Sequence, residues 1–314
     1  MLAIGLSVGA LGIWWMQRAR PRAGAYVDVL AVATDAAVAI RGEDGGKRSF
    51  VELIADGRLQ WQALVPRYAD PPRGTGLAAS GNAVTVRVVR DGRPELFALA
   101  TRDAEKLGGL HLSDRPPAAG GYTLPRVATV SDGARSFELF GDDRAVDAVA
   151  IGLGDGHVLW RVGLGPGPVE DAAVVDGDLV VRQAGRVRGF NGATGDERLT
   201  APALPAPLVD AIEPRVFAAV GAERASAVVV GDRGRFYVLD PVSHRLASVD
   251  GAAQTVTAIV RWPDGARVPA AQHVAPGALW LVAPGGIAAL DAVTLAPLHV
   301  VGAPPRPTKL ETSP

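Results

Sequence analysis

Residues 149–160 read Val-Ala-Ile-Gly-Leu-Gly-Asp-Gly-His-Val-Leu-Trp, and residues 50–61 read Phe-Val-Glu-Leu-Ile-Ala-Asp-Gly-Arg-Leu-Gln-Trp. Both stretches open with apolar residues, pass through Asp-Gly, and reach a tryptophan after three further residues. Asp and Gly tolerate the positive φ angles of a tight reversal, and runs rich in apolar residues form partly buried strands. Each stretch therefore predicts a strand, a turn and a returning strand.

The same pattern recurs along the chain with a period in the forties. Further copies of an apolar run followed by a turn lie at 96–103, 189–196, 237–244 and 288–295. If the apolar residues Leu53, Leu99, Ile151, Phe190, Leu239 and Leu290 are equivalent, successive copies lie 46, 52, 39, 49 and 51 residues apart. The chain is therefore predicted to consist of internal repeats.

Additional β-type runs at 83–89, 178–182, 225–230 and 278–282 lie between these copies, so each period holds about four short strands. Four antiparallel strands per repeat are typical of a β-propeller blade. We predict an all-β chain, a β-propeller of about six four-stranded blades, with seven blades as an alternative. The six blades are placed at 26–66, 76–112, 122–164, 168–200, 206–248 and 252–302. Two β-sandwiches, which also consist of short strands and turns, are the structural alternative.

The composition supports a folded, strand-rich chain and excludes several function classes. Of the 314 residues, 48% are hydrophobic and 5% aromatic, and 38 glycines with 24 prolines favour many short elements joined by turns. A net charge of −1 supplies no field that would gather nucleic acid. The absence of cysteine from the sequence excludes disulfides, thiolate nucleophiles and cysteine-held zinc or iron–sulfur clusters.

Residues 234–240 and 285–291 resemble the core of the pyrroloquinoline quinone-like, or quinoprotein-type, propeller repeat. They read Gly-Arg-Phe-Tyr-Val-Leu-Asp and Gly-Gly-Ile-Ala-Ala-Leu-Asp. Residues 191–195, Asn-Gly-Ala-Thr-Gly, resemble the turn of that repeat, and Trp61 and Trp160 resemble its closing tryptophan. The resemblance covers 24–302 in outline and implies that the two tryptophans pack blade against blade.

The quinoprotein-type family contains quinone-dependent dehydrogenases as well as non-catalytic scaffolds and sensor domains. Its dehydrogenases hold the cofactor against an adjacent cysteine pair and bind calcium through Glu, Asn and Asp. This chain has no cysteine, and its only asparagines, Asn82 and Asn191, lie beside no plausible carboxylate pair. The resemblance therefore implies a degenerate, non-catalytic member of the family that binds no cofactor.

No catalytic, cofactor-binding or metal-binding residues are predicted from other motifs. The histidines have no metal-ligand spacing, and the acidic residues at 142–143 and 176–178 lack the alternating ligand loop of a calcium site. The Gly-x-Gly-x-Gly runs at 152–156 and 163–167 precede no helical pattern, so we interpret them as turns rather than phosphate loops. The five histidines are His111, His157, His244, His273 and His299.

The N-terminus is apolar and ends against a basic flank. Leu2–Met16 carries no charge and is followed by Arg18, Arg20 and Arg22. Counted from Met1 to Met16, sixteen residues of helix rise about 24 Å, slightly less than the roughly 30 Å hydrocarbon core of a bilayer. We expect an uncleaved transmembrane anchor. A signal peptide cleaved near 23–25 and an ordinary core segment are the alternatives.

The expected organisation is an anchor with its basic flank over 1–23, a β-propeller over 24–302 and a Pro-rich disordered tail over 303–314. We predict a membrane-anchored, non-catalytic protein-interaction scaffold in an envelope-associated complex, with other proteins as partners and no nucleic acid. The alternative is a small-molecule sensor or a quinone-dependent oxidoreductase with its site in the central channel. The arginine flank favours a cytoplasmic propeller by the positive-inside rule. The family resemblance favours the periplasmic side, which we adopt.

Overall fold

The computed structural model describes residues 23–69, 76–79, 82–111, 128–142, 144–204, 212–221, 227–230, 234–240, 242–261, 277–283, 285–304 and 308–310. The expected anchor, Leu2–Met16, and its arginine flank lie outside these residues. Within the described ranges, no helix is both long and apolar enough to cross a bilayer.

The described chain is all-β, apart from one short helix, and its strands form antiparallel sheets. The first sheet holds β1 (Ala23–Ala31), β2 (Ala36–Glu43), β3 (Arg48–Ala55) and β4 (Arg58–Tyr68), and the second holds β5 (Leu77–Ala79), β6 (Ala83–Arg90), β7 (Arg93–Ala100) and β8 (Lys106–His111). The last two residues of β4 also pair with β6, which joins these two sheets. The third sheet holds β9 (Ala128–Ser131), β10 (Arg135–Asp142), β11 (Ala145–Gly152) and β12 (Val158–Gly165).

The C-terminal half of the chain forms three further sheets. The fourth holds β13 (Val169–Val175), β14 (Asp178–Gln183) and β15 (Arg186–Phe190). The fifth holds β16 (Ala227–Val230), β17 (Arg235–Asp240), β18 (Arg245–Asp250) and β19 (Thr255–Arg261), with β23 (Thr308–Leu310) paired to β19. The sixth holds β20 (Ala278–Ala283), β21 (Gly286–Asp291) and β22 (Pro297–Gly302).

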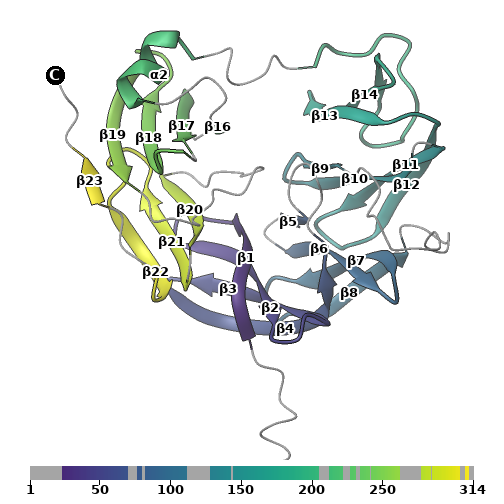
Figure 1. Ribbon diagram of the computed structural model, residues 1–314. Coiled ribbons are helices and arrows are strands. Elements are labelled where there is room, and N and C mark those ends of the chain that lie inside the picture. The colour runs from purple at the N-terminus through teal and green to yellow at the C-terminus, as the bar shows by residue number, and fades with distance from the viewer. Residues whose placement is uncertain are drawn as a thin grey trace, which may run out of the picture.

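The sheets stand side by side in an arc around a common centre (Figure 1). The inner strands β20, β1, β5, β9 and β13 contact one another in that order. Apolar clusters fill the spaces between neighbouring sheets, from the fifth through the sixth, first, second and third to the fourth. Radial packing of small antiparallel sheets is the arrangement of a β-propeller and not of two sandwiches, so the propeller-type fold predicted from the repeats is confirmed.

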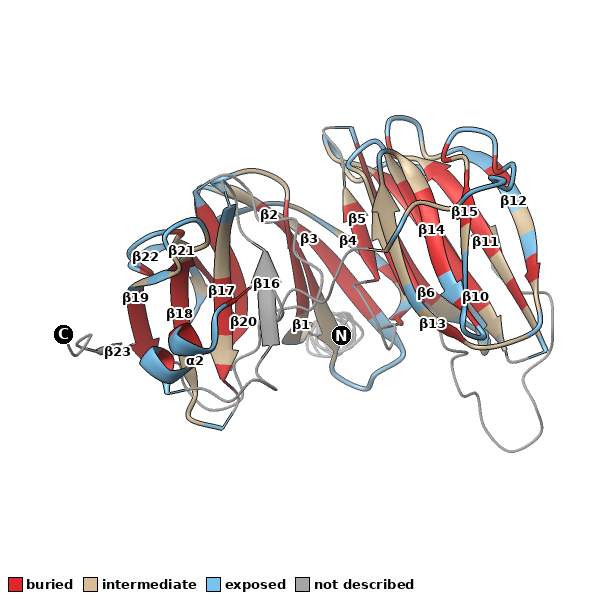
Figure 2. Cartoon of the chain, turned by 90° about the horizontal axis from the view of Figure 1, so that it is seen from above, coloured by how far each residue is buried: buried red, intermediate tan, exposed pale blue. Residues whose placement is uncertain are grey.

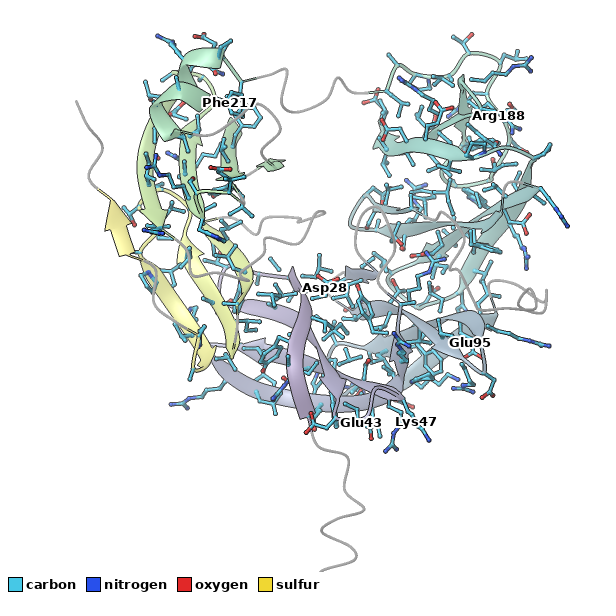
Figure 3. The ribbon with its side chains drawn as sticks, in the orientation of Figure 1. Asp28, Glu43, Lys47, Glu95, Arg188 and Phe217 are labelled. Carbon is cyan, nitrogen blue, oxygen red and sulfur yellow. The ribbon has the colours of Figure 1, made fainter. Side chains whose placement is uncertain are left out.

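The two ends of the folded region meet, because the sixth sheet packs on the first. Trp280 on β20 is fully buried in one cluster with Val29 of β1 and Ile54 of β3. Figure 2 shows buried residues running through the interior of each sheet, with exposed residues at the turns and along outer strands such as β12. Asp28 lies on the inner side of the arc, whereas Glu43 and Lys47 lie at its periphery (Figure 3).

The predicted strand, turn and returning strand is confirmed in five of the six repeats, whereas in the fourth the turn after β15 is followed only by an isolated bridge at Glu197. Four of the turns have six residues and the same two backbone hydrogen bonds. The amide of the first residue donates to the carbonyl of the sixth, and the amide of the fifth residue donates to the carbonyl of the first. The fifth residue of each has a positive φ, which closes the turn in the left-handed conformation. These four turns are 100–105, 152–157, 191–196 and 291–296.

The strand allocation of the last blades was predicted wrongly. β19 was placed in the sixth blade, 252–302, but it pairs with β18 in the fifth sheet. The side chain of Asp250 accepts hydrogen bonds from the amides of Ala252 and Ala253, so the apparent blade boundary is a hairpin turn. The fourth and sixth sheets show three described strands each rather than four, and Glu197 adds one isolated bridge to Phe190.

The sequence pattern also missed helix α2 (Pro214–Val220), within the range 206–248 assigned to strands. Pro214 begins the helix, and Gly221 ends it with a φ of 68°. Phe217 and Val220 are buried against the fifth sheet, so packing rather than intrinsic propensity stabilises this short helix of about two turns. Three residues of the expected disordered tail, Thr308–Leu310, are strand residues in β23.

Candidate functional site

One position on the outer strand recurs at the contact between neighbouring sheets. In four sheets the register places it just after a bulge, opposite an apolar residue of the preceding strand. The residues in this docking position are Trp61 on β4, Gly108 on β8, Trp160 on β12 and His299 on β22.

Both tryptophans bind the turn of the next sheet along the arc. The indole Nε1 of Trp160 donates to the carbonyl oxygen of Gly192 at 3.0 Å, and that of Trp61 donates to the carbonyl of Thr101. Gly192 and Thr101 are each the second residue of a six-residue turn. The prediction, by resemblance, that the two tryptophans dock sheet against sheet is therefore confirmed.

Between the fifth and sixth sheets, a serine and a tyrosine instead of a tryptophan bind the carbonyl of the second turn residue. Ser248 Oγ and Tyr237 Oη donate to the carbonyl of Ala292, the second residue of turn 291–296, at 2.7 and 3.3 Å. Between the sixth and first sheets the docking residue is His299. Its ring stacks on Trp280 with centroids 6.4 Å apart, and its Cβ lies beside Gly57 in the β3–β4 turn.

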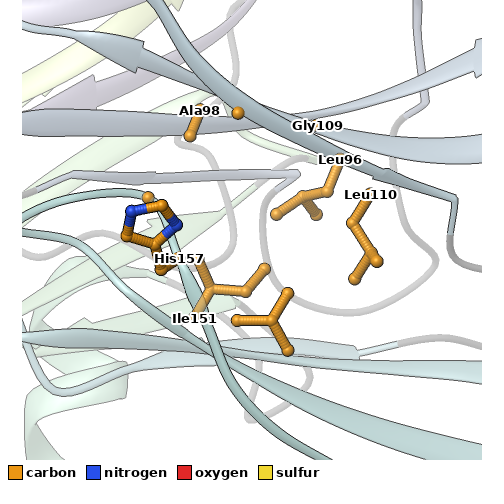
Figure 4. A pocket seen from close by; sticks show the side chains of 9 residues that line it. Leu96, Ala98, Gly109, Leu110, Ile151 and His157 are labelled. Carbon is orange, nitrogen blue, oxygen red and sulfur yellow. The ribbon is translucent and has the colours of Figure 1, made fainter.

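The docking position between the second and third sheets holds no side chain, because it is Gly108. A cavity of about 140 Å³ lies there, opening between β8 and the turn 152–157 (Figure 4). Leu96 and Ile151 form its buried walls, and His157 lies at its exposed rim. The complete lining is Leu96, Ala98, Gly108, Gly109, Leu110, Ile151, Gly156, His157 and Val158.

Three glycines let the backbones approach one another closely around this cavity. A Cβ on Gly156, whose φ is 73°, would lie 2.6 Å from the Cβ of Ala98. Such a contact is too short for two carbon atoms, so Gly156 is required by packing as well as by its φ. A Cβ on Gly108 would meet only the carbonyl oxygen of Gly156, at 3.4 Å. A side chain at Gly108 therefore has room toward the cavity.

The interface around the cavity has a small apolar core. Its buried cluster consists of Leu96, Phe140, Val149 and Ile151, with Leu110 packed against them. Between the third and fourth sheets, by contrast, the buried cluster has twelve residues, among them Phe137 and Trp160, whose rings are 5.8 Å apart. Fewer buried apolar side chains hold the second and third sheets together, so this is the weaker of the two interfaces.

A buried ion pair crosses the same interface. Arg87 of β6 lies 3.4 Å from Glu138 of β10, and each side chain is 1% exposed. Thr129 Oγ1 and Ser136 Oγ also donate to the Glu138 carboxylate, at 2.9 and 3.1 Å. Burial raises the pKa of Glu138, while Arg87 and the two hydroxyls act in the opposite direction.

The inner strands β5 and β20 are wholly apolar, whereas β1, β9 and β13 each carry polar residues. β5 reads Leu-Ala-Ala and β9 reads Ala-Thr-Val-Ser. The carboxylate of Asp28 on β1 accepts hydrogen bonds from Tyr68 Oη and the amide of Val29. Across the described ranges, no three His, Cys, Asp or Glu side chains are grouped so that they could hold a metal ion.

The residues that the motifs singled out are dispersed over the arc. His157 lines the cavity, His299 lies in the docking position, and His244 is in the β17–β18 turn. The run 152–156 forms a turn, as predicted. Asp178 binds Arg198, which holds the pKa of that carboxyl below its usual range. His273 lies outside the described residues.

The sequence analysis missed Gly108, although the repeat spacing contained a signal for it. Trp160 follows Ile151 by nine residues, and nine residues after the equivalent Leu99 comes Gly108. A glycine at a position that is tryptophan in two repeats and histidine in a third indicates an unfilled docking position. Only the structure shows that the neighbouring side chains leave the space open.

Comparison with known proteins finds loose similarities to solved structures. BamB from Moraxella catarrhalis is 14% identical over 91% of this chain and 80% of that chain, with a TM-score of 0.35. The dihydro-heme d1 dehydrogenase NirN in complex with DHE is 15% identical over 90% of this chain and 57% of that chain, with a TM-score of 0.37. Apo AztD from Citrobacter koseri is 13% identical over 91% of this chain and 89% of that chain, with a TM-score of 0.31.

No protein-family model matches the chain, and no curated protein matches it. The propeller-type fold therefore rests on the sheets and interfaces of the chain itself.

Proposed function

We propose that this chain is a membrane-anchored, non-catalytic β-propeller of six blades that acts as a protein-interaction scaffold in an envelope-associated complex. The six sheets from β1 to β22 are the six blades. Leu2–Met16 is the anchor, the propeller is extracytoplasmic, and its partners are membrane or envelope proteins.

The observation that carries this proposal is a set of exposed apolar side chains on the outer strands, here called the apolar outer circumference, which lie among polar residues such as Arg58, Gln62 and Arg161. Among the residues that the structure describes, eight of the eleven exposed large hydrophobic ones lie on the outermost described strands of five sheets. Isolated exposed apolar residues are ordinary, but apolar side chains repeated along one surface are typical of protein interaction sites. The eight residues are Leu59 and Leu64 on β4, Leu107 on β8, Val158 and Leu159 on β12, Val187 on β15, and Leu298 and Val300 on β22.

The strand edges on the same circumference support the proposal. β12 and β22 each end their sheet, so their outer backbone groups face away from it. On the fifth sheet the corresponding edge, β19, is paired with β23. An outer edge of this propeller therefore accepts a further strand.

Site-specific photo-crosslinking in cells tests the scaffold role. A photoreactive amino acid replaces Leu64, Val187 or Leu298 on the outer strands, and replaces Lys47 or Asp103 in exposed turns as a control. The proposal expects discrete protein adducts from the outer-strand positions and few from the turns. Adducts from the turns alone, or from no position, would contradict it.

Reporter fusions at Pro314 test the proposed side of the membrane. A reporter active only in the periplasm is compared with one active only in the cytoplasm. Periplasmic activity supports the extracytoplasmic propeller. Cytoplasmic activity would overturn that placement and identify Arg18, Arg20 and Arg22 as the orientation signal.

A further inference from the structure

We propose that the cavity at Gly108 binds the indole side chain of a tryptophan presented by a partner protein. This inference rests on the proposed scaffold function and deepens it by naming the chemistry that one site recognises. Gly108, in the docking position of the second sheet, lines this cavity with backbone alone.

The identity of the guest follows from the two occupied positions of the same chain. Trp61 and Trp160 occupy the equivalent place in the first and third sheets, and each indole N–H points to the second carbonyl of the next turn. Turn 152–157 has the same two backbone hydrogen bonds as turn 191–196, to which Trp160 binds. In this register Leu153 stands where Gly192 does, so the turn beside the cavity has the same backbone pattern as a turn that receives an indole.

The size and lining of the cavity suit one aromatic group. Its volume is about 140 Å³, and Leu96, Leu110 and Ile151 provide apolar walls. An engineered apolar cavity of about 150 Å³ in another protein binds benzene, so a space of this size takes an aromatic ring. Gly108, Gly109 and Gly156 line the cavity with bare backbone, and Gly156 itself packs directly against Ala98.

The position of the mouth indicates that the guest belongs to a protein. Val158, 44% exposed, lines the cavity, and the bulge residues Leu107 and Leu159 beside it are 36% and 46% exposed. The cavity is thus continuous with the apolar outer circumference. A partner that covers this surface places an aromatic side chain at the mouth and buries the surrounding apolar area at the same time.

Titration of the full chain in detergent with N-acetyl-L-tryptophanamide tests recognition of the indole. Amide NMR signals of Gly108, Gly109 and Gly156 are expected to shift, and N-acetyl-L-leucinamide is expected to leave them in place. Gly108→Trp, which fills the cavity from within, should abolish the shifts. Shifts at the other two glycines that persist in Gly108→Trp, or that are absent from the unaltered chain, would overturn the proposal.

A second variant covers the case in which Gly108→Trp does not fold. Val158→Asp places a charge at the mouth and should weaken binding of N-acetyl-L-tryptophanamide at least tenfold. Val187→Asp, at a similarly exposed valine on β15, should leave binding unchanged. Equal effects of the two substitutions would show that the cavity is not the binding site.

Crosslinking in cells separates a partner side chain from a free aromatic compound. A photoreactive residue at Val158 should give a protein adduct that Gly108→Trp removes, while the adduct from Leu298 remains. A Leu298 adduct with none from Val158 would contradict this inference and leave the scaffold role standing. Binding of the tryptophan amide without a Val158 adduct would identify the guest as a free aromatic compound and overturn the partner assignment.

Discussion

The indole nitrogen of Trp160 donates a hydrogen bond of 3.0 Å to the carbonyl oxygen of Gly192, 32 residues further along the chain and in the next sheet of the arc. Trp61 repeats this contact with Thr101. The acceptor is a backbone carbonyl, so the contact does not depend on the side chain of the turn residue that supplies it. That independence explains how turns of such different sequence are held in the same way.

Removing only the hydrogen bond of Trp160 should cost less than removing its ring. Trp160→Phe keeps an aromatic ring but loses the N–H donor, so we expect the free energy of unfolding to fall by about 1 kcal/mol from the hydrogen bond. Trp160→Ala should cost about 3–5 kcal/mol, because a cavity replaces a buried indole. Chemical denaturation measures both values. Leu159→Ala, at the neighbouring exposed residue, is the control and should change stability by less than about 0.5 kcal/mol. Equal losses for Phe and Ala would refute the role of the ring.

Gly195 should tolerate no side chain, because the Trp160 ring covers it. A Cβ there would lie 2.8 Å from the ring, whereas a Cβ on Gly185 has no neighbour within 4 Å. The two glycines have nearly the same φ, 78° and 75°, so alanine strains both backbones equally. Gly195→Ala should therefore lower the thermal midpoint clearly more than Gly185→Ala. If the two variants unfold together, the ring does not pack on the turn as described.

Removing one partner of the Arg87–Glu138 pair should lower the free energy of unfolding strongly, whereas replacing both partners by apolar residues should lower it little. Glu138→Ala leaves the Arg87 charge buried without its carboxylate, so we expect a loss of about 3–5 kcal/mol. The double variant Arg87→Met with Glu138→Leu removes both charges and should recover most of that loss. A double-mutant cycle of Arg87→Met, Glu138→Leu and the double variant in chemical denaturation measures the coupling. Additive losses from the two sites would mean that the side chains do not interact.

Asp291 should make stability depend on acidic pH. Hydrogen bonds from the amide and hydroxyl of Thr294 and the amide of Val293 hold the pKa of this carboxyl below its usual range. The folded-state pKa is depressed, so the contribution to stability is present above the unfolded pKa and is lost as pH falls through the folded pKa. Asp291→Asn keeps an acceptor oxygen but no titrating group. The thermal midpoint of this variant should therefore fall less than that of the unaltered chain as the pH is lowered from about 4 to 2. An unchanged acid limb would contradict this assignment.

The strands were predictable because their pattern is local, whereas the helix and the sheet boundary were not. The apolar run and Asp-Gly of 149–160 specify a hairpin without reference to the rest of the chain. Helix α2 is short and its pattern weak, and its stability comes from burial of Phe217 against the fifth sheet. β19 was misplaced because a hairpin turn and a blade boundary contain the same turn residues.

The candidate site depended on contacts between residues far apart in sequence. The family resemblance identified Trp61 and Trp160 as docking residues, and the hydrogen bonds agree. Arg87 and Glu138 are 51 residues apart, and neither stands out in the sequence as a buried charge. The cavity at Gly108 is defined by residues of two neighbouring sheets, which surround a position without a side chain. A single sequence specifies that space only after its sheets have been placed in order.

The thermal stability of Gly108→Trp tests the central claim most directly, because the variant supplies the missing docking residue. Gly42→Trp is the matched control, since Gly42 is also a strand glycine, where a Cβ would meet only one atom within 4 Å. If the cavity is an unfilled docking position, Gly108→Trp should gain about 0.5–2 kcal/mol in the free energy of unfolding relative to the control. A loss of about 1–3 kcal/mol, as in an overpacked interface, would show that the second and third sheets leave no place for an indole.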